Sequence, residues 1–339
     1  MPSWTEIYRL PLLAGLTCLL IGFLLVDVFS RRWTGPPLAE SSLPGDVWLT
    51  DPPGALTLAE TLGDRWVVSA DEAKQLIQSG ATLLDARGKY RLVSLPGAVS
   101  VSWRTFSQTH APHQGKLLAT IPVLTQRLRE VGVANNRPVV VVGDPIRGWG
   151  EEGRIVWMLR SLGHNQAVMV DGGYRALVDA GFSLKHLPVK LPGNRPAGDF
   201  VANPVGDWTA DQQHVKALLN APNTVILDTR EPREYAGATP YGEKRGGHLP
   251  GAVPLYFKEL LGEDGRQLSA EAIATKLAEL GVTRETTVIT YCTGGVRSAW
   301  LTAVLTDLGF RAKNYPGSMW EWSSLPAADY PLVRTNPGW

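Results

Sequence analysis

The residues with the clearest chemical meaning lie in one short loop in the last quarter of the chain. Glycines in a loop that leads into a helix let several backbone N–H groups point at one place and favour negative charge there. A thiol at that place is expected to have a lowered pKa and to react as a thiolate. A closing arginine adds a fixed charge and a forked set of donors suited to an oxyanion. The loop consists of Cys292, Thr293, Gly294, Gly295, Val296 and Arg297.

The elements on both sides of this loop follow from the local pattern. Residues 287–291 form a β-branched, mostly apolar run that predicts a strand, and residues 298–305 have the pattern of a helix. Cys292 is therefore predicted at the carboxyl end of a strand. Open α/β sheets bind their ligands outside that end of their strands.

Composition limits the class of protein. The chain has 339 residues, 44% of them hydrophobic and 19% charged, which indicates a globular protein of about two domains. A formal net charge of +1 gives no reason to expect nucleic acid as a partner. The other cysteine, Cys18, is far from Cys292 in sequence, and we expect no structural disulfide between them. The histidines show no metal-ligand spacing, and we expect neither a metal nor a cofactor.

Two halves of the chain repeat the same motifs in the same order. In each half, short β-branched runs alternate with helical patterns, which predicts an α/β domain with a mostly parallel sheet flanked by helices. Three of the repeated pairs are Leu-Leu-Asp-Ala-Arg (83–87) with Ile-Leu-Asp-Thr-Arg (226–230), Leu-Pro-Gly-Ala-Val at 95–99 and 249–253, and the strands 139–142 and 287–290.

These motifs resemble those of tandem rhodaneses, the thiosulfate and 3-mercaptopyruvate sulfurtransferases. The resemblance is carried by Leu-Asp-Thr-Arg-Glu (227–231), Gly-His-Leu-Pro-Gly-Ala (247–252), Tyr-Cys-Thr-Gly-Gly-Val-Arg-Ser (291–298) and Tyr-Pro-Gly-Ser-Met-Trp-Glu-Trp (315–322). It implies two tandem rhodanese-like domains and a sulfurtransferase. In that chemistry, a cysteine takes a sulfane sulfur from thiosulfate or a related donor as a persulfide and passes it to cyanide or a thiol.

The resemblance also implies roles for individual residues. Cys292 would be the nucleophile, the loop N–H groups would stabilise its anionic forms, and Arg297 would hold the sulfonate end of the donor. Asp228 and Arg230 would form a supporting ion pair at a strand end, with Arg230 as a further candidate for substrate contact. Ser298 would support the loop from the start of the following helix.

The first half departs from this pattern. After the strand 139–142 the chain continues with Gly143 and Asp144, and no cysteine follows. This half cannot form a persulfide, so we expect it to be an inactive domain that packs on the catalytic one and helps to shape the cleft. In the second half, Glu234 stands where some animal thiosulfate enzymes carry a basic residue that contacts the donor.

The N-terminus carries a second clear signal. Residues 10–29 are almost wholly apolar, close to the ~20 residues that span a bilayer as a helix, and Trp4, Tyr8 and Trp33 flank them. A cleaved signal peptide is the competing interpretation, weakened by the length of the run and by the lack of a clear cleavage site. We expect a single-pass membrane protein. Arg31 and Arg32 after the run, against Arg9 before it, weakly favour a cytoplasmic soluble part.

The predicted organisation has five parts. They are one transmembrane helix as the anchor (1–32), a Pro/Gly-rich tether (33–64), the inactive rhodanese-like domain (65–182), a linker (183–207) and the catalytic rhodanese domain (208–330).

Two other functions compete with sulfur transfer. Cys-Arg loop phosphatases also hold a thiolate in an anion-binding loop, but with one residue more between the two than the four found here. The shorter loop makes a smaller cradle, which suits a sulfur atom better than a phosphate group. The second alternative is a membrane-tethered rhodanese fold that serves as a docking or assembly module with little or no catalytic activity. The intact loop from Cys292 to Arg297 argues for retained sulfur transfer.

Overall fold

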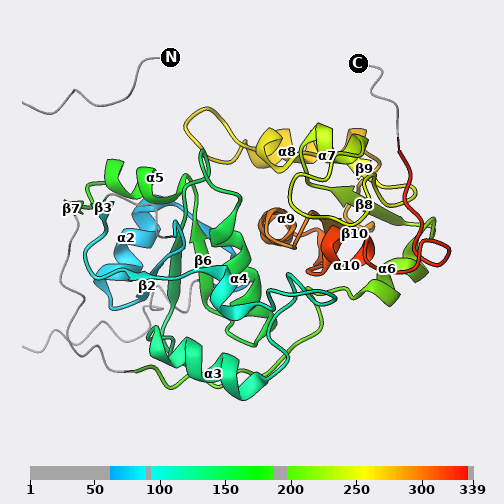
Figure 1. Cartoon of the computed structure of the whole chain (residues 1–339). Coiled ribbons are helices and arrows are strands. Elements are labelled where there is room, and N and C mark those ends of the chain that lie inside the picture. Colours follow the sequence, from blue (N-terminus) through cyan, green and yellow to red (C-terminus); the bar gives the residue numbers. More distant parts are fainter. Residues whose placement is uncertain (1–61, 89–92, 187–196, 335–339) are drawn as a thin grey trace, which may run out of the picture. The chain divides into compact units, whose positions relative to one another are not determined.

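The computed structural model of the chain describes residues 62–88, 93–186 and 197–334 (Figure 1). The predicted membrane helix lies outside these residues, as do most of the tether and the middle of the linker. In the part of the chain that is described, no helix is both long and apolar enough to cross a membrane.

The first half is built on a five-stranded sheet, and each pair of neighbouring strands in it is parallel. Its order is β1-β6-β5-β2-β4. The central strand β5 (Val139–Val142) consists of four buried valines, as expected for a parallel strand that is covered on both faces. The other strands are β1 (Val67–Val68), β2 (Thr82–Asp85), β4 (Val99–Ser100) and β6 (Ala167–Val170), and β3 (Val93–Ser94) pairs separately with β7 (Lys185–His186).

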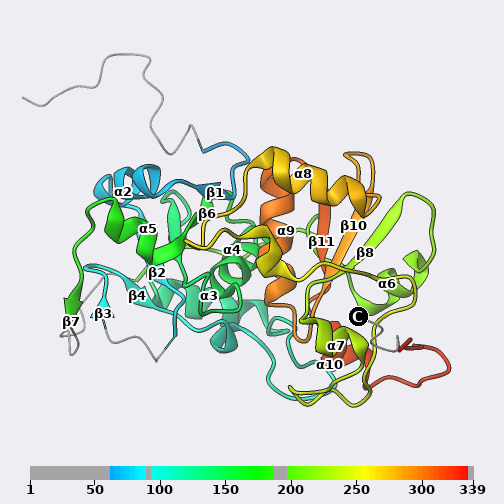
Figure 2. The same cartoon turned by 90° about the horizontal axis from the view of Figure 1, so that it is seen from above.

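Helices cover both faces of this sheet (Figure 2). Helices α2 (Ala70–Gln78) and α5 (Gly173–Asp179) share a core with Val140 and Val142. Helices α3 (Ile121–Glu130) and α4 (Glu151–Ser161) share another core with Val139 and Val141 on the opposite face. The short 3-10 helix η1 (Trp103–Phe106) completes this half.

The second half repeats the arrangement with a parallel sheet in the order β11-β10-β8-β9. Thr209 forms a parallel bridge with Asn314 of β11. It therefore lies at the edge of this sheet that corresponds to the position of β1 in the first sheet. The two sheets therefore share one topology, which confirms the predicted α/β repeat. Its elements are α6 (Gln212–Leu218), β8 (Thr224–Asp228), α7 (Pro232–Ala236), β9 (Val253–Pro254), η2 (Phe257–Leu260), α8 (Ala270–Glu279), β10 (Thr287–Tyr291), α9 (Arg297–Asp307), β11 (Arg311–Asn314) and α10 (Ser318–Trp322).

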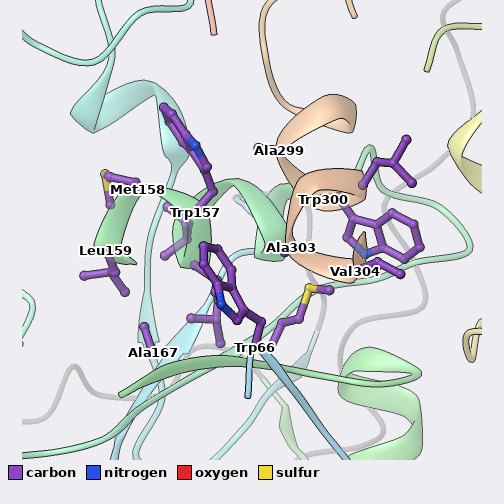
Figure 3. Packing of buried hydrophobic residues seen from close by; sticks show 14 of the residues in the cluster. Trp66, Trp157, Met158, Leu159, Ala167, Ala299, Trp300, Ala303 and Val304 are labelled. Atoms are coloured by element: carbon purple, nitrogen blue, oxygen red, sulfur yellow. The ribbon is translucent and has the colours of Figure 1, made fainter. Parts of the chain in front are cut away.

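One hydrophobic core is shared by the two halves. It joins residues of β5 and α4 with residues of β8, β10 and α9, whereas the outer face of each sheet has a core of its own. Helices α4 and α9 meet at the centre of the shared core, and both are buried almost all round. Figure 3 shows side chains of both helices in this cluster, among them Trp157 and Trp300.

Glycine permits the close approach of these two helices. A Cβ atom on Gly153 of α4 would lie 2.4 Å from the Cα atom of Trp300 on α9. Because α9 begins at Arg297, this contact fixes the helix that carries the end of the cysteine loop.

Candidate active site

Cys292 follows β10 directly and precedes the first turn of α9. Its side chain is 1% exposed. The N–H of Gly295 donates to Sγ of Cys292 at 3.1 Å, and the hydroxyl of Ser298 lies 3.6 Å from the same sulfur. The loop therefore presents donors to the sulfur from its own backbone and from the helix start, as the sequence pattern predicts.

A second layer of polar groups holds these donors in place. The hydroxyl of Ser298 lies 2.7 Å from Oδ1 of Asn314, which is the alternative acceptor for its single proton. The amide of Asn314 in turn donates to the carbonyl of Gly295 at 3.4 Å. The N–H of Cys292 donates to Oγ of Ser318 at 3.1 Å. Asn314 and Ser318 are buried, and neither was predicted as a site residue, although Ser318 lies in the motif 315–322.

The pKa of Cys292 is set by opposing effects. Burial alone would raise it. The charge of Arg297 and hydrogen bonds from Ser298 and Gly294 outweigh burial and hold the pKa below the ordinary thiol value. The site thus favours a thiolate, which is the nucleophilic form of cysteine.

The side chain of Arg297 forms an ion pair with the carboxylate of Glu234. Its Nη1 donates to Oε2 of Glu234 at 2.6 Å and its Nη2 to Oε1 at 2.8 Å, so the two side chains form a buried bidentate ion pair. Nη2 also donates to Oγ1 of Thr293 at 2.7 Å. Thr293 can itself donate to Glu234 at 2.7 Å or to Glu243 at 3.3 Å. The arginine predicted to hold the donor is therefore shared with a carboxylate that sequence analysis marked only as a departure.

Two aromatic rings lie next to this ion pair, one from each half. The guanidinium carbon of Arg297 lies 5.1 Å from the ring centre of Trp149 and 5.8 Å from that of Tyr241. These rings contact each other edge-on and are each 36% exposed. They form the outer boundary of the site beside Arg297.

The two loop glycines are required by the space around them. A Cβ atom on Gly294 would lie 2.1 Å from the ring of Trp320. Gly295 has φ of +74° and a Cβ atom there would lie 2.6 Å from Cα of Pro316. A larger residue at either place would displace the loop from the sulfur. Val296, the N-cap of α9, is also buried.

Asp228 and Arg230 form a fully buried ion pair at the end of β8. Arg230 donates to the carboxylate at 2.6 and 2.9 Å and to the carbonyl of Gly247 at 2.7 Å. The hydroxyl of Tyr291, the residue before Cys292, donates to Asp228 at 2.6 Å. The pair therefore supports the strand end that leads to Cys292.

The first half contains the same ion pair without a nucleophile. Arg87 donates to Asp85 at 2.7 and 2.9 Å, at the end of β2. A pair that recurs where there is no cysteine is explained by the fold alone. Arg230 thus contacts Asp228 at the strand end and the carbonyl of Gly247. Gly295 and Ser298 are the residues that contact the sulfur.

In the first half, a carboxyl group fills the place that corresponds to the nucleophile. Gly143 follows β5 as Cys292 follows β10, and a Cβ atom on it would lie 1.8 Å from Oε2 of Glu152. Both carboxyl oxygens of Glu152 are buried, and in the part of the chain that is described neither has a partner at hydrogen-bond geometry, although the side chain of Trp300 acts to lower the pKa. Burial, together with the nearby charges of Glu151 and Asp144, raises the pKa of Glu152 to about 8.

The first half also contributes directly to the cysteine loop. Arg154 of α4 donates to the carbonyl of Gly295 at 3.0 Å, and Gly115 packs against Gly294. Sequence analysis missed both residues. The sequence did hold one signal for Arg154, because this charged residue begins the otherwise apolar run 154–159. A charge buried with such a run needs a polar partner.

Comparison with protein families shows which family the domain around Cys292 belongs to. The model of the rhodanese-like domain matches residues 69–180 and again residues 211–325. The chain belongs to the rhodanese family. The second match contains the Cys292 loop, and the first contains the half without a nucleophile. The predicted pair of tandem rhodanese-like domains is thereby confirmed.

Curated relatives agree with this assignment. The chain is 31% identical over 247 residues to the thiosulfate sulfurtransferase of Pseudomonas aeruginosa, with 72% of this chain and 87% of that protein covered. It is 30% identical over 285 residues to the putative thiosulfate sulfurtransferase SseB of Mycobacterium tuberculosis, with 77% and 94% covered. These relatives and the intact loop support a sulfurtransferase function.

Solved structures share the fold. The wild-type structure of EanB superposes with a TM-score of 0.68 at 19% identity and covers 80% of this chain and 69% of that one. YnjE gives a TM-score of 0.66 at 19% identity with the same coverage.

Proposed function

We propose that this rhodanese is a thiosulfate sulfurtransferase that carries sulfur as a persulfide on Cys292. The observation that carries the proposal is the position of Sγ, which receives the N–H of Gly295 at 3.1 Å beside the hydroxyl of Ser298. Such a cradle stabilises an anionic sulfur, both as the thiolate and as the terminal sulfur of a persulfide. The relatives named thiosulfate sulfurtransferase support thiosulfate as the donor.

The first step transfers sulfur to the enzyme. The thiolate of Cys292 attacks the outer sulfur of thiosulfate and forms a new S–S bond. The bond between the two sulfurs of thiosulfate breaks, and its electron pair leaves with sulfite. The product on the enzyme is a persulfide whose terminal sulfur is anionic, and no oxidant or reductant is consumed.

The second step returns the enzyme to its starting state. Cyanide or a thiolate attacks the terminal sulfur of the persulfide, and the S–S bond to Cys292 breaks. The electron pair returns to Sγ, which the loop stabilises again as a thiolate. The products are thiocyanate from cyanide, or a new persulfide from a thiol.

Arg297 is the proposed contact for the sulfonate end of the donor. Both terminal nitrogens of its guanidinium donate to Glu234, so a donor anion competes with that carboxylate for the same charge. Some animal thiosulfate enzymes of this family carry a basic residue where this chain has Glu234. We therefore expect a donor KM that depends on Glu234.

A donor assay on the full chain tests the proposal. Thiosulfate and 3-mercaptopyruvate are compared as donors, with thiocyanate formation from cyanide as the readout. The wild-type protein should form thiocyanate with thiosulfate and gain the mass of one sulfur atom when cyanide is left out. Cys292→Ser should show neither, while keeping the same unfolding curve. Absence of both signals from the wild-type protein contradicts the proposal and favours a docking module.

A membrane anchor at residues 1–32 is part of the same proposal. Its support is the apolar run from residue 10 to residue 29 with flanking aromatics. The full chain should stay in the membrane fraction after a carbonate wash, and a variant that lacks residues 1–32 should be released. Protease digestion of sealed vesicles tests the cytoplasmic placement of the catalytic part. Release of the full chain by carbonate contradicts the anchor.

A further inference from the structure

Arg154 of the first half reaches into the catalytic loop of the second. Its side chain is buried, and Nη1 donates to the carbonyl of Gly295 at 3.0 Å. Nη2 donates to Oγ of Ser107 at 3.1 Å and to the carbonyl of Gly115 at 2.5 Å. Arg154 therefore ties two segments of the first half to the residue whose N–H points at the sulfur.

The charge of Arg154 differs from the other buried cations near the site, because no carboxylate lies within ion-pair distance of it among the described residues. Its hydrogen-bond partners are two carbonyls and a hydroxyl, all neutral. Three other cations near the loop have carboxylate partners: Arg297 pairs with Glu234, Arg230 with Asp228, and Lys116 with Glu321.

The guanidinium carbon of Arg154 lies 4.6 Å from the ring centre of Trp157 and 5.9 Å from that of Trp103, and the charge that acts on it is that of Cys292. Burial lowers the pKa of Arg154 to about 9 and the charge of Cys292 raises it, so the guanidinium is charged at pH 7. Arg297 is the stronger charge acting on Cys292, but Glu234 offsets it at hydrogen-bond distance. A lone buried cation is costly unless an anion balances it. The Cys292 thiolate provides that balance, and so does an anionic persulfide.

Arg154 also fixes the position of Gly295. Gly295 donates its N–H to Sγ and accepts the guanidinium N–H on its carbonyl. A Cβ atom on Gly295 would lie 2.8 Å from Nη1 of Arg154, so the two groups are in close contact. The arginine thus holds the same residue whose amide points at the sulfur.

We propose that Arg154 is a positioning residue of the sulfurtransferase, supplied by the half that has no nucleophile, and that its charge and its bond to Gly295 stabilise the anionic sulfur on Cys292. The inference deepens the proposed function and assigns a task to the first half that goes beyond packing. The half without a cysteine completes the anion site of the other half.

The thiol titration of Cys292 in the full chain tests this role. The rate of carbamidomethylation is followed against pH by mass spectrometry of the peptide with Cys292, because Cys18 is the other thiol. Arg154→Met removes charge and donors, Arg154→Gln keeps a donor, and Arg154→Lys keeps the charge. Several other charged groups near Cys292 are unchanged in all variants: Arg297, Glu234, Glu243, Asp228, Arg230, Glu321 and Lys116.

Arg160→Met is the matched control. Arg160 lies on the same helix, is 2% exposed and donates to the carbonyls of Ala167 and Arg65, away from the cysteine loop. Its loss also removes a buried arginine that bonds to carbonyls. The control therefore separates an effect on Cys292 from a general effect on the fold, which circular dichroism and thermal unfolding report in parallel.

We expect Arg154→Met and Arg154→Gln to raise the titration midpoint of Cys292 by about one pH unit, a tenfold loss of thiolate below the midpoint. Arg154→Lys should keep the midpoint close to that of the wild type, because it keeps the charge. Arg160→Met should titrate as the wild type does. Neutral variants that titrate like Arg160→Met overturn the proposal, as does a lysine variant that titrates like Arg154→Gln. The titration needs no sulfur donor, so it stays informative if thiosulfate proves not to be the substrate.

Discussion

Glu234 sets the charge available to a substrate at this site. It pairs with Arg297 through two hydrogen bonds and accepts a third from Thr293, while Glu243 lies on the other side of that threonine. Hydrogen bonds and the charge of Arg297 outweigh burial and lower the pKa of Glu234, so it is ionised at neutral pH. A doubly charged donor, such as the proposed thiosulfate, would therefore meet a carboxylate beside Arg297.

Glu234→Gln should improve the binding of thiosulfate. Glutamine keeps an acceptor for Arg297 but removes the negative charge that competes with the donor. The KM for thiosulfate should fall by roughly threefold to tenfold, or up to about 1.4 kcal/mol. Steady-state kinetics measure the effect. Glu259→Gln, which removes a glutamate from an exposed ion pair with Lys276, is the control and should leave KM unchanged. An unchanged KM for Glu234→Gln would show that the carboxylate does not compete with the donor, and a higher KM would show that it helps to hold the donor site.

Glu152 makes the stability of the fold depend on pH. Its pKa is raised from 4.5 to about 8 by burial. Because the folded state holds the proton more tightly than the unfolded state, the contribution to stability is complete below pH 4.5 and is lost as pH rises through about 8. This sign is opposite to that of a salt-bridged carboxylate.

Glu152→Gln should remove this dependence, since glutamine is neutral throughout. At pH 8 the variant should be more stable than the wild type by on the order of 1–3 kcal/mol, and the difference should shrink towards pH 5. Urea unfolding at several pH values measures it. Glu279→Gln, at an exposed position of α8, should follow the wild-type curve. A variant that is less stable at pH 8 would mean that Glu152 is ionised and held by partners.

At the scale of elements, the contact between α4 and α9 links the two halves to the cysteine loop. In an exposed helix, alanine in place of glycine would stabilise by about 1 kcal/mol. At Gly153 the added Cβ atom would lie 2.4 Å from the backbone of Trp300. Gly153→Ala should therefore lower the free energy of unfolding, by about 1–3 kcal/mol, instead of raising it. Thermal or urea unfolding measures the change. Gly206→Ala, where no atom lies within 4 Å of the added Cβ, is the control. Equal stability of the two variants would show that the helices can move apart freely.

The elements were predictable from sequence to different degrees. The strands 139–142 and 287–291 and the position of Cys292 at a strand end follow from periodicity and from the repeat, and the structure shows them. The local pair of Asp228 and Arg230, which the resemblance to rhodaneses implies, is also present. Arg154 could not be placed on Gly295, because that contact joins residues 141 positions apart across two halves. The pairing of Arg297 with Glu234 likewise depends on how α7 and α9 meet.

At the scale of the whole molecule, the two halves share their main core. Trp157 of α4 and Trp300 of α9 belong to the same buried cluster (Figure 3). Strand residues of both sheets belong to it as well. The N–H groups of Trp66 and Val67 in the first half donate to Asp307 at the end of α9. Separating the halves would expose this apolar surface and remove the bond of the buried Arg154 to Gly295. Neither half is thus expected to keep its structure alone.

The described part of the chain should therefore unfold in one cooperative step. Circular dichroism reports both halves, and carbamidomethylation of Cys292 reports the second half as the urea concentration rises. The two curves should coincide, since burial of Cys292 depends on contacts from both halves. Gly153→Ala, a change in the first half, should move both midpoints to lower urea by the same amount. If the cysteine became reactive at a urea concentration that left a large part of the circular dichroism signal intact, the halves would be independent, and Arg154 could not hold the loop through the shared core.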